Sequence, residues 1–254
     1  MSISTTSADP ASLIRKHKIC YLCGLLGADT TEHVLPRCLY PNQKKLPDNV
    51  LTLPAHLECN RQTAKDEEAF RDFISPSLAS HEVGHSLWDR TWRGIHRPAA
   101  ARYQATYYRS IISRFERDDC GKRVAVPLAT TLQAERVHWV LAKIVKGLFT
   151  AMTGELIPNS QVCWDFGLFT TEKDAKDGSA CLPQSRMLHD VLSIQWGRAF
   201  DEPLATLWVL GFYGTQFFWV ETTPKNRQGP ADCIQEPSRI VWPNNSFSPE
   251  ALSS

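Results

Sequence analysis

Residues 20–60 read CYLCGLLGADTTEHVLPRCLYPNQKKLPDNVLTLPAHLECN, and this stretch decides the fold of the first part of the chain. Metal-ligating residues lie at its two ends as close pairs, Cys20 with Cys23 and His56 with Cys59. A short gap lets both members of a pair reach one ion from a tight turn, and three cysteines with one histidine form the closed shell of a structural zinc site. A unit this small buries little core, whereas structural zinc contributes on the order of 10 kcal/mol of folding free energy. The sequence therefore predicts one zinc ion that joins the two pairs.

The chain between the two pairs is rich in turns. Glycine and proline interrupt its apolar pieces throughout residues 19–59, which favours hairpins and loops over long helices. The next segment, NRQTAKDEEAFRDFI from Asn60 onward, contains strong helix formers and ends before Pro76. We therefore expect a small hairpin unit followed by a helix.

The order of motifs in this unit resembles that of the HNH endonuclease superfamily. The pattern is C-x-x-C, then EHVLPR, then DNVLTLP, then H-x-x-CN and a charged helix. It is similar to the zinc-containing variant in which the last motif residue is asparagine, and the resemblance covers residues 18–75. Two later segments, HSLWDRTWRGIHRP and ERVHWVLAKIVKGLF, resemble the later parts of uncharacterised bacterial HNH proteins of similar length.

The resemblance implies a ββα-metal fold and a set of site residues. A hairpin would bear Glu32 and His33, a loop would bear Asn49, and the helix would open at Asn60. His33 would be the general base, and Asn49 would orient it by hydrogen bonding. Glu32 and Asn60 would hold a catalytic Mg²⁺ or Mn²⁺. The sequence departs from the best-known pattern, in which Asp is common in place of Glu32 and a second His in place of Asn60.

The chemistry of these residue types agrees with hydrolysis of a phosphodiester. That reaction needs a base that deprotonates water and a cation that offsets negative charge in the transition state. A histidine with an unperturbed pKa of about 6.5 is largely neutral near neutral pH. Glu32 and Asn60 offer the hard oxygen donors that Mg²⁺ prefers. We therefore expect a metal-dependent endonuclease that acts on nucleic acid, with DNA as the expected substrate.

Two other functions stay open on the sequence. The first is a non-catalytic zinc-knuckle module that binds nucleic acid or protein, for which the adjacent Glu32 and His33 are coincidental. The second is a zinc metalloprotease, because His81, Glu82 and His85 match the H-E-x-x-H signature. That match follows a serine-rich stretch rather than lying well inside a long helix, and no third ligand stands at a compelling position. The plain structural interpretation is the start of a helix.

Basic residues interleave with aromatic residues over residues 88–123. This segment contains nine Arg or Lys and four Asp or Glu, which leaves a local charge of +5. Basic side chains can neutralise phosphates, and aromatic rings can stack on unpaired bases. We therefore select Arg93, Arg97 and Arg102 as a candidate nucleic-acid surface. An ordinary solvated helix face, packed through its aromatic residues, fits the pattern equally well.

Changes in composition divide the whole chain, and the predicted fold class is α+β. The expected parts are a loose leader over 1–18, the HNH domain over 19–75, a helical basic connecting segment over 76–130 and an α+β domain over 131–254. The last part should begin with an amphipathic helix over about 132–152. Short strands should follow near 162–169, 190–196, 204–211 and 216–222. We expect them to form an antiparallel sheet packed on that helix.

The overall composition is that of an ordinary folded protein. Hydrophobic residues make up 43% of the 254 residues and charged residues 22%. No run is apolar enough for a membrane helix and the N-terminus lacks the pattern of a signal peptide, so a cytoplasmic location is expected. In that reducing compartment the eight cysteines should not form disulfides. The net charge of +1 means that any nucleic-acid surface must be local, and the C-terminal domain is a possible contact for a second copy or a protein partner.

Overall fold

The structure is a computed structural model, and it describes residues 9–110, 112–117, 123–128, 134–169 and 171–225. These residues form helices and three antiparallel sheets, so the predicted α+β class is confirmed. The sheets are two hairpins and one larger sheet of five strands.

The N-terminal unit is a hairpin followed by a long helix. Its elements are α1 (Ser12–Lys16), β1 (Thr30–His33), η1 (Arg37–Leu39), β2 (Thr52–Ala55), α2 (Leu57–Ile74) and η2 (Ser75–Leu78). Strands β1 and β2 pair antiparallel, with His33 opposite Thr52. Helix α2 begins three residues before the predicted start at Asn60. The Asp29 carboxylate supports this early start, because its Oδ1 accepts from the backbone N–H of Leu57 at 2.7 Å, one of the amides that a helix leaves open.

Part of the segment predicted as a loose leader is folded. Helix α1 places Ala11 and Ile14 in the core, where they are 0% and 3% exposed. The Asp9 carboxylate accepts from the backbone N–H of Ala11 at 3.0 Å. Residues 9–18 therefore belong to the folded unit, and residues 1–8 lie outside the described residues.

The connecting segment contains helices and a hairpin. Its elements are α3 (His85–Ile95), η3 (Pro98–Ala100), α4 (Ala101–Ser110), β3 (Ile112–Arg117) and β4 (Arg123–Leu128). The prediction of a helical segment up to residue 130 is wrong for its last part, where β3 and β4 pair antiparallel. The residues of β4 favour a strand over a helix, because the β-branched Val124 and Val126 alternate along it and Pro127 does not fit a helix interior.

The C-terminal part is a helix packed on a five-stranded antiparallel sheet. Its elements are α5 (Ala134–Thr153), β5 (Val162–Phe169), α6 (Glu172–Ser179), β6 (Gln184–Leu188), β7 (Leu192–Arg198), β8 (Thr206–Phe212) and β9 (Gln216–Pro224). The strand order is β5-β9-β8-β7-β6. The four predicted strands correspond to β5, β7, β8 and β9, so these predictions are confirmed. The sequence did not predict β6, because its side chains are mostly exposed and show no apolar alternation.

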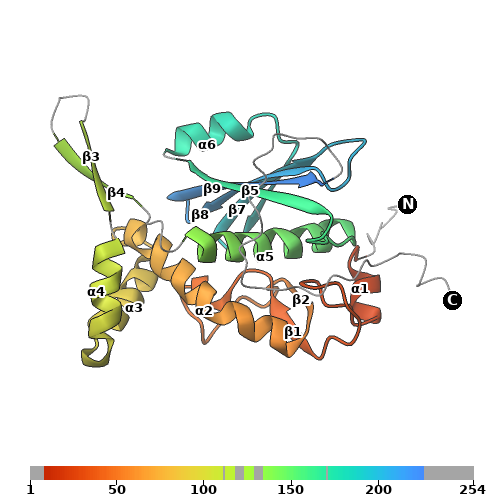
Figure 1. The fold of residues 1–254 in the computed structure, drawn as a ribbon, viewed down its shortest axis with the longest axis horizontal. Coiled ribbons are helices and arrows are strands. Elements are labelled where there is room, and N and C mark those ends of the chain that lie inside the picture. Colours follow the sequence, from red (N-terminus) through yellow and green to blue (C-terminus); the bar gives the residue numbers. More distant parts are fainter. Residues whose placement is uncertain (1–8, 111, 118–122, 129–133, 170, 226–254) are drawn as a thin grey trace, which may run out of the picture.

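Helix α5 lies between the large sheet and the N-terminal unit (Figure 1). Buried hydrophobic residues of α2, α5 and the sheet belong to one core cluster. A Cβ atom at Gly147 would come within 2.5 Å of Val34, so this glycine lets the α5 backbone approach the segment after β1. Helix α5 therefore packs directly against the N-terminal unit.

Helix α5 is also apolar, but neither α5 nor any other helix in the described ranges is long and apolar enough to cross a membrane.

Candidate metal centre and the adjacent charged cluster

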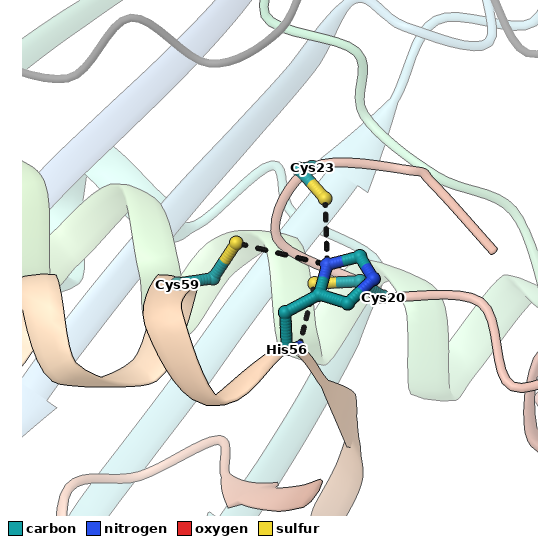
Figure 2. A group of neighbouring side chains, drawn as sticks. All are labelled: Cys20, Cys23, His56 and Cys59. Carbon is teal, nitrogen blue, oxygen red and sulfur yellow. Dashed lines mark hydrogen bonds between the residues drawn. The ribbon is translucent and has the colours of Figure 1, made fainter. Parts of the chain in front are cut away.

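The four predicted zinc ligands converge on one point (Figure 2). Ligand atoms of Cys20, Cys23, His56 and Cys59 all lie within 4.8 Å of one another. A tetrahedral zinc ion with Zn–S bonds of about 2.3 Å holds its ligand atoms about 4 Å apart, so the arrangement suits this metal. The four residues could therefore hold one zinc ion, as their spacing predicts.

Local backbone structure brings the two pairs together. Cys20 and Cys23 lie in a turn that is closed by a hydrogen bond from the Gly24 N–H to the Cys20 carbonyl at 2.7 Å. Gly24 has φ of +79°, in the left-handed region that favours glycine. His56 immediately precedes α2, and Cys59 lies in its first turn. The backbone N–H of His56 donates to Sγ of Cys20 at 3.4 Å, which ties the start of the helix to the turn.

The orientation of His56 identifies the nitrogen that would bind the metal. Its Nδ1 lies 3.3 Å from Sγ of Cys23 and 3.9 Å from Sγ of Cys59. Its Nε2 lies 3.0 Å from the carbonyl oxygen of Leu26, which accepts the hydrogen bond when Nε2 carries the proton. Metal-binding histidines commonly use their second nitrogen in this way, because the hydrogen bond fixes both the tautomer and the ring orientation. The imidazole is therefore already oriented for a metal at Nδ1.

The three thiols influence one another strongly. Hydrogen bonds from Cys23 and Cys59 lower the pKa of Cys20 to about 2. The hydrogen bond between Cys23 and Cys20 raises the pKa of Cys23, and the hydrogen bond between Cys59 and Cys20 raises the pKa of Cys59. One thiolate is thus favoured and the other two thiols are disfavoured as thiolates. Three neighbouring thiolates would repel one another. A bound cation offsets this repulsion, because it lets all three sulfurs coordinate as thiolates.

A buried lysine from α5 contacts the turn between the two N-terminal cysteines. Lys146 is 3% exposed, and its Nζ donates to the carbonyl oxygen of Leu22 at 3.3 Å. The same Nζ lies 5.9 Å from the centroid of the Trp164 ring. Zinc bound by three thiolates and a neutral imidazole carries a net charge of −1 (+2 − 3). A lysine beside this turn would help to balance that charge when zinc is bound.

A second charged cluster, formed by Glu32, Lys143 and Glu67, lies beside the hairpin. The Lys143 Nζ from α5 contacts Oε1 of Glu32 on β1 and Oε1 of Glu67 on α2. Lys143 is 2% exposed and Glu32 is 6% exposed, so the ion pairs are largely shielded from water. Burial raises the pKa of Glu67, and the contacts with Lys143 oppose that rise. The cluster joins three elements that are distant in the sequence.

The candidate base, His33, lies next to this cluster at the end of β1. Its side chain is half-buried. Burial lowers its pKa from the ordinary value of 6.5; the charge of Glu32 opposes this, while Arg37 and Lys143 add to it. The imidazole is therefore neutral and able to accept a proton at neutral pH.

The two candidate asparagines differ in their positions. Asn60 is half-buried in α2, and the Thr63 hydroxyl donates to its backbone carbonyl at 2.9 Å. The same hydroxyl lies 3.3 Å from Oε1 of Glu67, so Asn60 and the charged cluster lie on one face of α2. Asn49 is exposed in the turn before β2, and no hydrogen bond joins it to His33 within the described part of the chain. Asn60 thus lies on the same face of α2 as Glu67 but about two helical turns before it, and within the described residues no hydrogen bond joins the Asn60 side chain to Glu32.

Sequence reasoning did not select Glu67 or Lys143. Glu67 lies seven residues after Asn60, about 10 Å along a helix, and that distance is too long for the two to share an ion directly. Thr63 could have pointed to Glu67, because it lies three residues after Asn60 and four residues before Glu67 on the same helix. Lys143 could have been found as a charged residue in the middle of the apolar stretch LAKIVKGLF.

The protease signature does not form the helical site that its chemistry requires. Helix α3 begins at His85, so His81 lies before the helix rather than one turn along it. Nδ1 of His81 accepts from the backbone N–H of Gly84 at 2.9 Å, and Nδ1 of His85 lies 2.6 Å from the carbonyl oxygen of Ala79. Within the described ranges, the Cys/His set is the one group of three or more His, Cys, Asp or Glu residues that could hold a metal. The plain interpretation of this motif as a helix start is therefore the one that the fold supports.

The basic segment includes both exposed and structural arginines. The three selected residues, Arg93, Arg97 and Arg102, are exposed on or near α3 and α4. Arg90 instead donates to backbone carbonyls of Tyr40 and Pro41, at 3.3 and 2.8 Å, and ties α3 to the N-terminal unit. The local charge that is open to a partner is therefore smaller than the sequence count.

Comparisons of this chain with family models, curated proteins and solved structures gave no match.

Proposed function

We propose that the chain is a metal-dependent nuclease whose active unit is the zinc-stapled hairpin and helix. The observation that carries the proposal is the arrangement of β1, β2 and α2 around the Cys/His cluster, with the adjacent Glu32 and His33 on β1. The shared contact of Glu32 and Glu67 with Lys143 brings β1 close to α2. This is the order and topology that the resemblance to HNH endonucleases predicts for residues 18–75.

The chemistry assigned to the chain's own residues is general base catalysis. His33 accepts a proton from a water molecule as the water oxygen forms its bond to phosphorus, and the bond from phosphorus to the leaving sugar oxygen breaks. The lowered pKa of His33 suits this role, because the free base is present at neutral pH. A positioned general base typically contributes a factor of about 100 to 10,000 in rate.

The side-chain oxygens of Glu32 and Asn60 are of the kind that suits a hard divalent cation. Glu32 and Asn60 are the residues that would hold Mg²⁺ or Mn²⁺, with water and substrate phosphate as further ligands. Two carboxylates, Glu32 and Glu67, share the single Lys143 ammonium group, so negative charge that can attract a further cation remains here. When bound, the divalent cation would offset the negative charge that develops on the phosphate. The cysteine-rich site serves a different need and is assigned to structural zinc.

The nucleic acid is assigned to the side of the molecule that bears α3 and α4. Arg93, Arg97 and Arg102 are exposed there, and Trp92 is 44% exposed on the same helix as Arg93. Exposed arginines neutralise phosphates without selecting a sequence. DNA is the proposed substrate.

Cleavage of defined nucleic acids tests the proposal. Zinc-loaded protein should degrade plasmid, single-stranded DNA or RNA when Mg²⁺ or Mn²⁺ is added, and a chelator that leaves the tightly held zinc in place should stop the reaction. Gel analysis of the products over time is the measurement. Cleavage that proceeds equally well in the chelator, or intact substrates under every condition, would refute the proposed activity.

A second candidate is a non-catalytic zinc module that binds nucleic acid or protein. The observation in its favour is the ion pair between Glu32 and Lys143, which gives Glu32 a structural partner without any added metal. In that case His33 has no chemical task. Binding of nucleic acid without turnover, unchanged when His33 is replaced, would favour this candidate over the nuclease.

A further inference from the structure

Lys143 places a positive charge in the protein interior, where buried charges are costly. A lysine that is 2% exposed loses almost all of its hydration, and such a charge is tolerated only when close partners compensate it. Its partners here are two carboxylates, Glu32 on β1 and Glu67 on α2. With all three groups ionised, the cluster has a net charge of −1 (+1 − 2).

The partners of Lys143 are connected to the residues proposed for chemistry. Glu32 is the neighbour of His33 in β1. Oε1 of Glu67 lies 3.3 Å from the Thr63 hydroxyl, which donates to the backbone carbonyl oxygen of Asn60 at 2.9 Å. A continuous set of contacts thus runs from β1 through Lys143 to the start of α2. Loss of Lys143 would therefore remove the group that joins the Glu32 and Glu67 carboxylates.

We propose that Lys143 is a positioning residue of this site, which holds Glu32 and Glu67 together and competes with a divalent cation for the Glu32 carboxylate. The inference rests on the proposed function, since it takes Glu32 as a ligand of the catalytic cation. The Lys143 ammonium group donates to Oε1 of Glu32, and its positive charge repels a cation bound by the same carboxylate. The lysine therefore keeps the acids close together without metal and weakens metal binding, whereas a neutral side chain of similar length removes the competitor.

Binding of Mn²⁺ to the zinc-loaded full chain, without nucleic acid, tests this proposal. Free Mn²⁺ is measured by electron paramagnetic resonance for the wild type and for Lys143→Met. Removal of one positive charge within contact distance should tighten Mn²⁺ binding by about tenfold or more. Lys143→Arg keeps the charge and should retain the weaker affinity of the wild type.

Two further comparisons control for folding and for charge. Lys143→Met leaves two buried acids without a counter-charge, so the same substitution is also made in a Glu67→Gln background, where one acid remains. The double variant should bind Mn²⁺ about tenfold more tightly than Glu67→Gln alone. Arg136→Gln removes one positive charge at the surface of the same helix, where Arg136 contacts Asp66 at 3.5 Å, and should change the affinity by less than about twofold.

The results separate this proposal from the nuclease proposal. Tighter Mn²⁺ binding in the Lys143→Met variants supports the role of Lys143, even if the wild type cleaves no nucleic acid. Folded variants whose Mn²⁺ affinity is unchanged or weaker overturn it, even if the wild type is an active nuclease. The Lys143→Arg variant adds a second criterion. If it bound Mn²⁺ as tightly as Lys143→Met does, the positive charge at this position would not control the affinity, and the proposal would be overturned.

Discussion

Replacing Cys59 with serine is expected to unfold the N-terminal unit. The substitution opens the shell formed with Cys20, Cys23 and His56, whose ligand atoms lie within 4.8 Å of one another. Structural zinc contributes on the order of 10 kcal/mol, which is comparable to the whole net stability of a typical domain, about 5–15 kcal/mol. We expect Cys59→Ser to lose zinc and the cooperative melting transition of this unit. Elemental analysis and circular dichroism melting curves are the measurements.

The loss should also reach the C-terminal part, because the core is shared. Helix α5 packs against α2 and the sheet within one cluster of buried residues. The matched control is Cys181→Ser, which alters an exposed cysteine outside the metal centre and should keep both zinc and melting temperature. A Cys59→Ser protein that retains stoichiometric zinc and melts like the wild type would refute the assignment of this ligand.

Replacing His33 with alanine should greatly reduce turnover while the fold persists. The side chain is half-buried and has no structural metal to hold, so the melting temperature should stay within about 3 °C of the wild type and the zinc content should not change. Loss of the base should lower the cleavage rate by about 100-fold or more. Substrate binding should be retained. His17→Ala, a half-buried histidine outside the site, is the control and should cleave normally.

The pH dependence of the wild type gives the same prediction a second readout. The base must be unprotonated, and burial lowers the pKa of His33 below its ordinary value of 6.5. Activity should therefore be present at neutral pH and should fall only as the pH drops through a value below 6.5. Near-normal cleavage by His33→Ala, or an unchanged acidic limb in its residual activity, would exclude His33 as the base.

Local spacing made the metal centre and several elements predictable. The two-residue gaps within each Cys/His pair and the turn-rich chain between the pairs indicated one shared ion, and the four side chains converge. Helical periodicity located α5 to within about two residues at either end, and Gly154, with φ of +77°, follows it. These signals are local, so they can be read without knowledge of the tertiary fold.

The charged cluster was not predictable in the same way. Lys143 and Glu32 are 111 residues apart, and nothing in either local sequence indicates that they meet. Their contact depends on how α5 packs against the hairpin, which Gly147 permits by its close approach to Val34. The hairpin of β3 and β4 was missed for a different reason, since a prediction that followed the aromatic and basic pattern ignored its β-branched residues. Features that depend on long-range packing, or on a choice between competing local signals, could therefore not be predicted from the sequence.

The hairpin, the start of α2 and the proposed active site all depend on the zinc centre. X-ray absorption at the zinc edge, combined with elemental analysis of the purified full chain, tests it most directly. We predict about one zinc per chain, bound by three sulfur atoms at about 2.3 Å and one nitrogen atom at about 2.0–2.1 Å. Folded protein without zinc, or a zinc shell of oxygen and nitrogen alone, would contradict the assignment of Cys20, Cys23, His56 and Cys59 as its ligands.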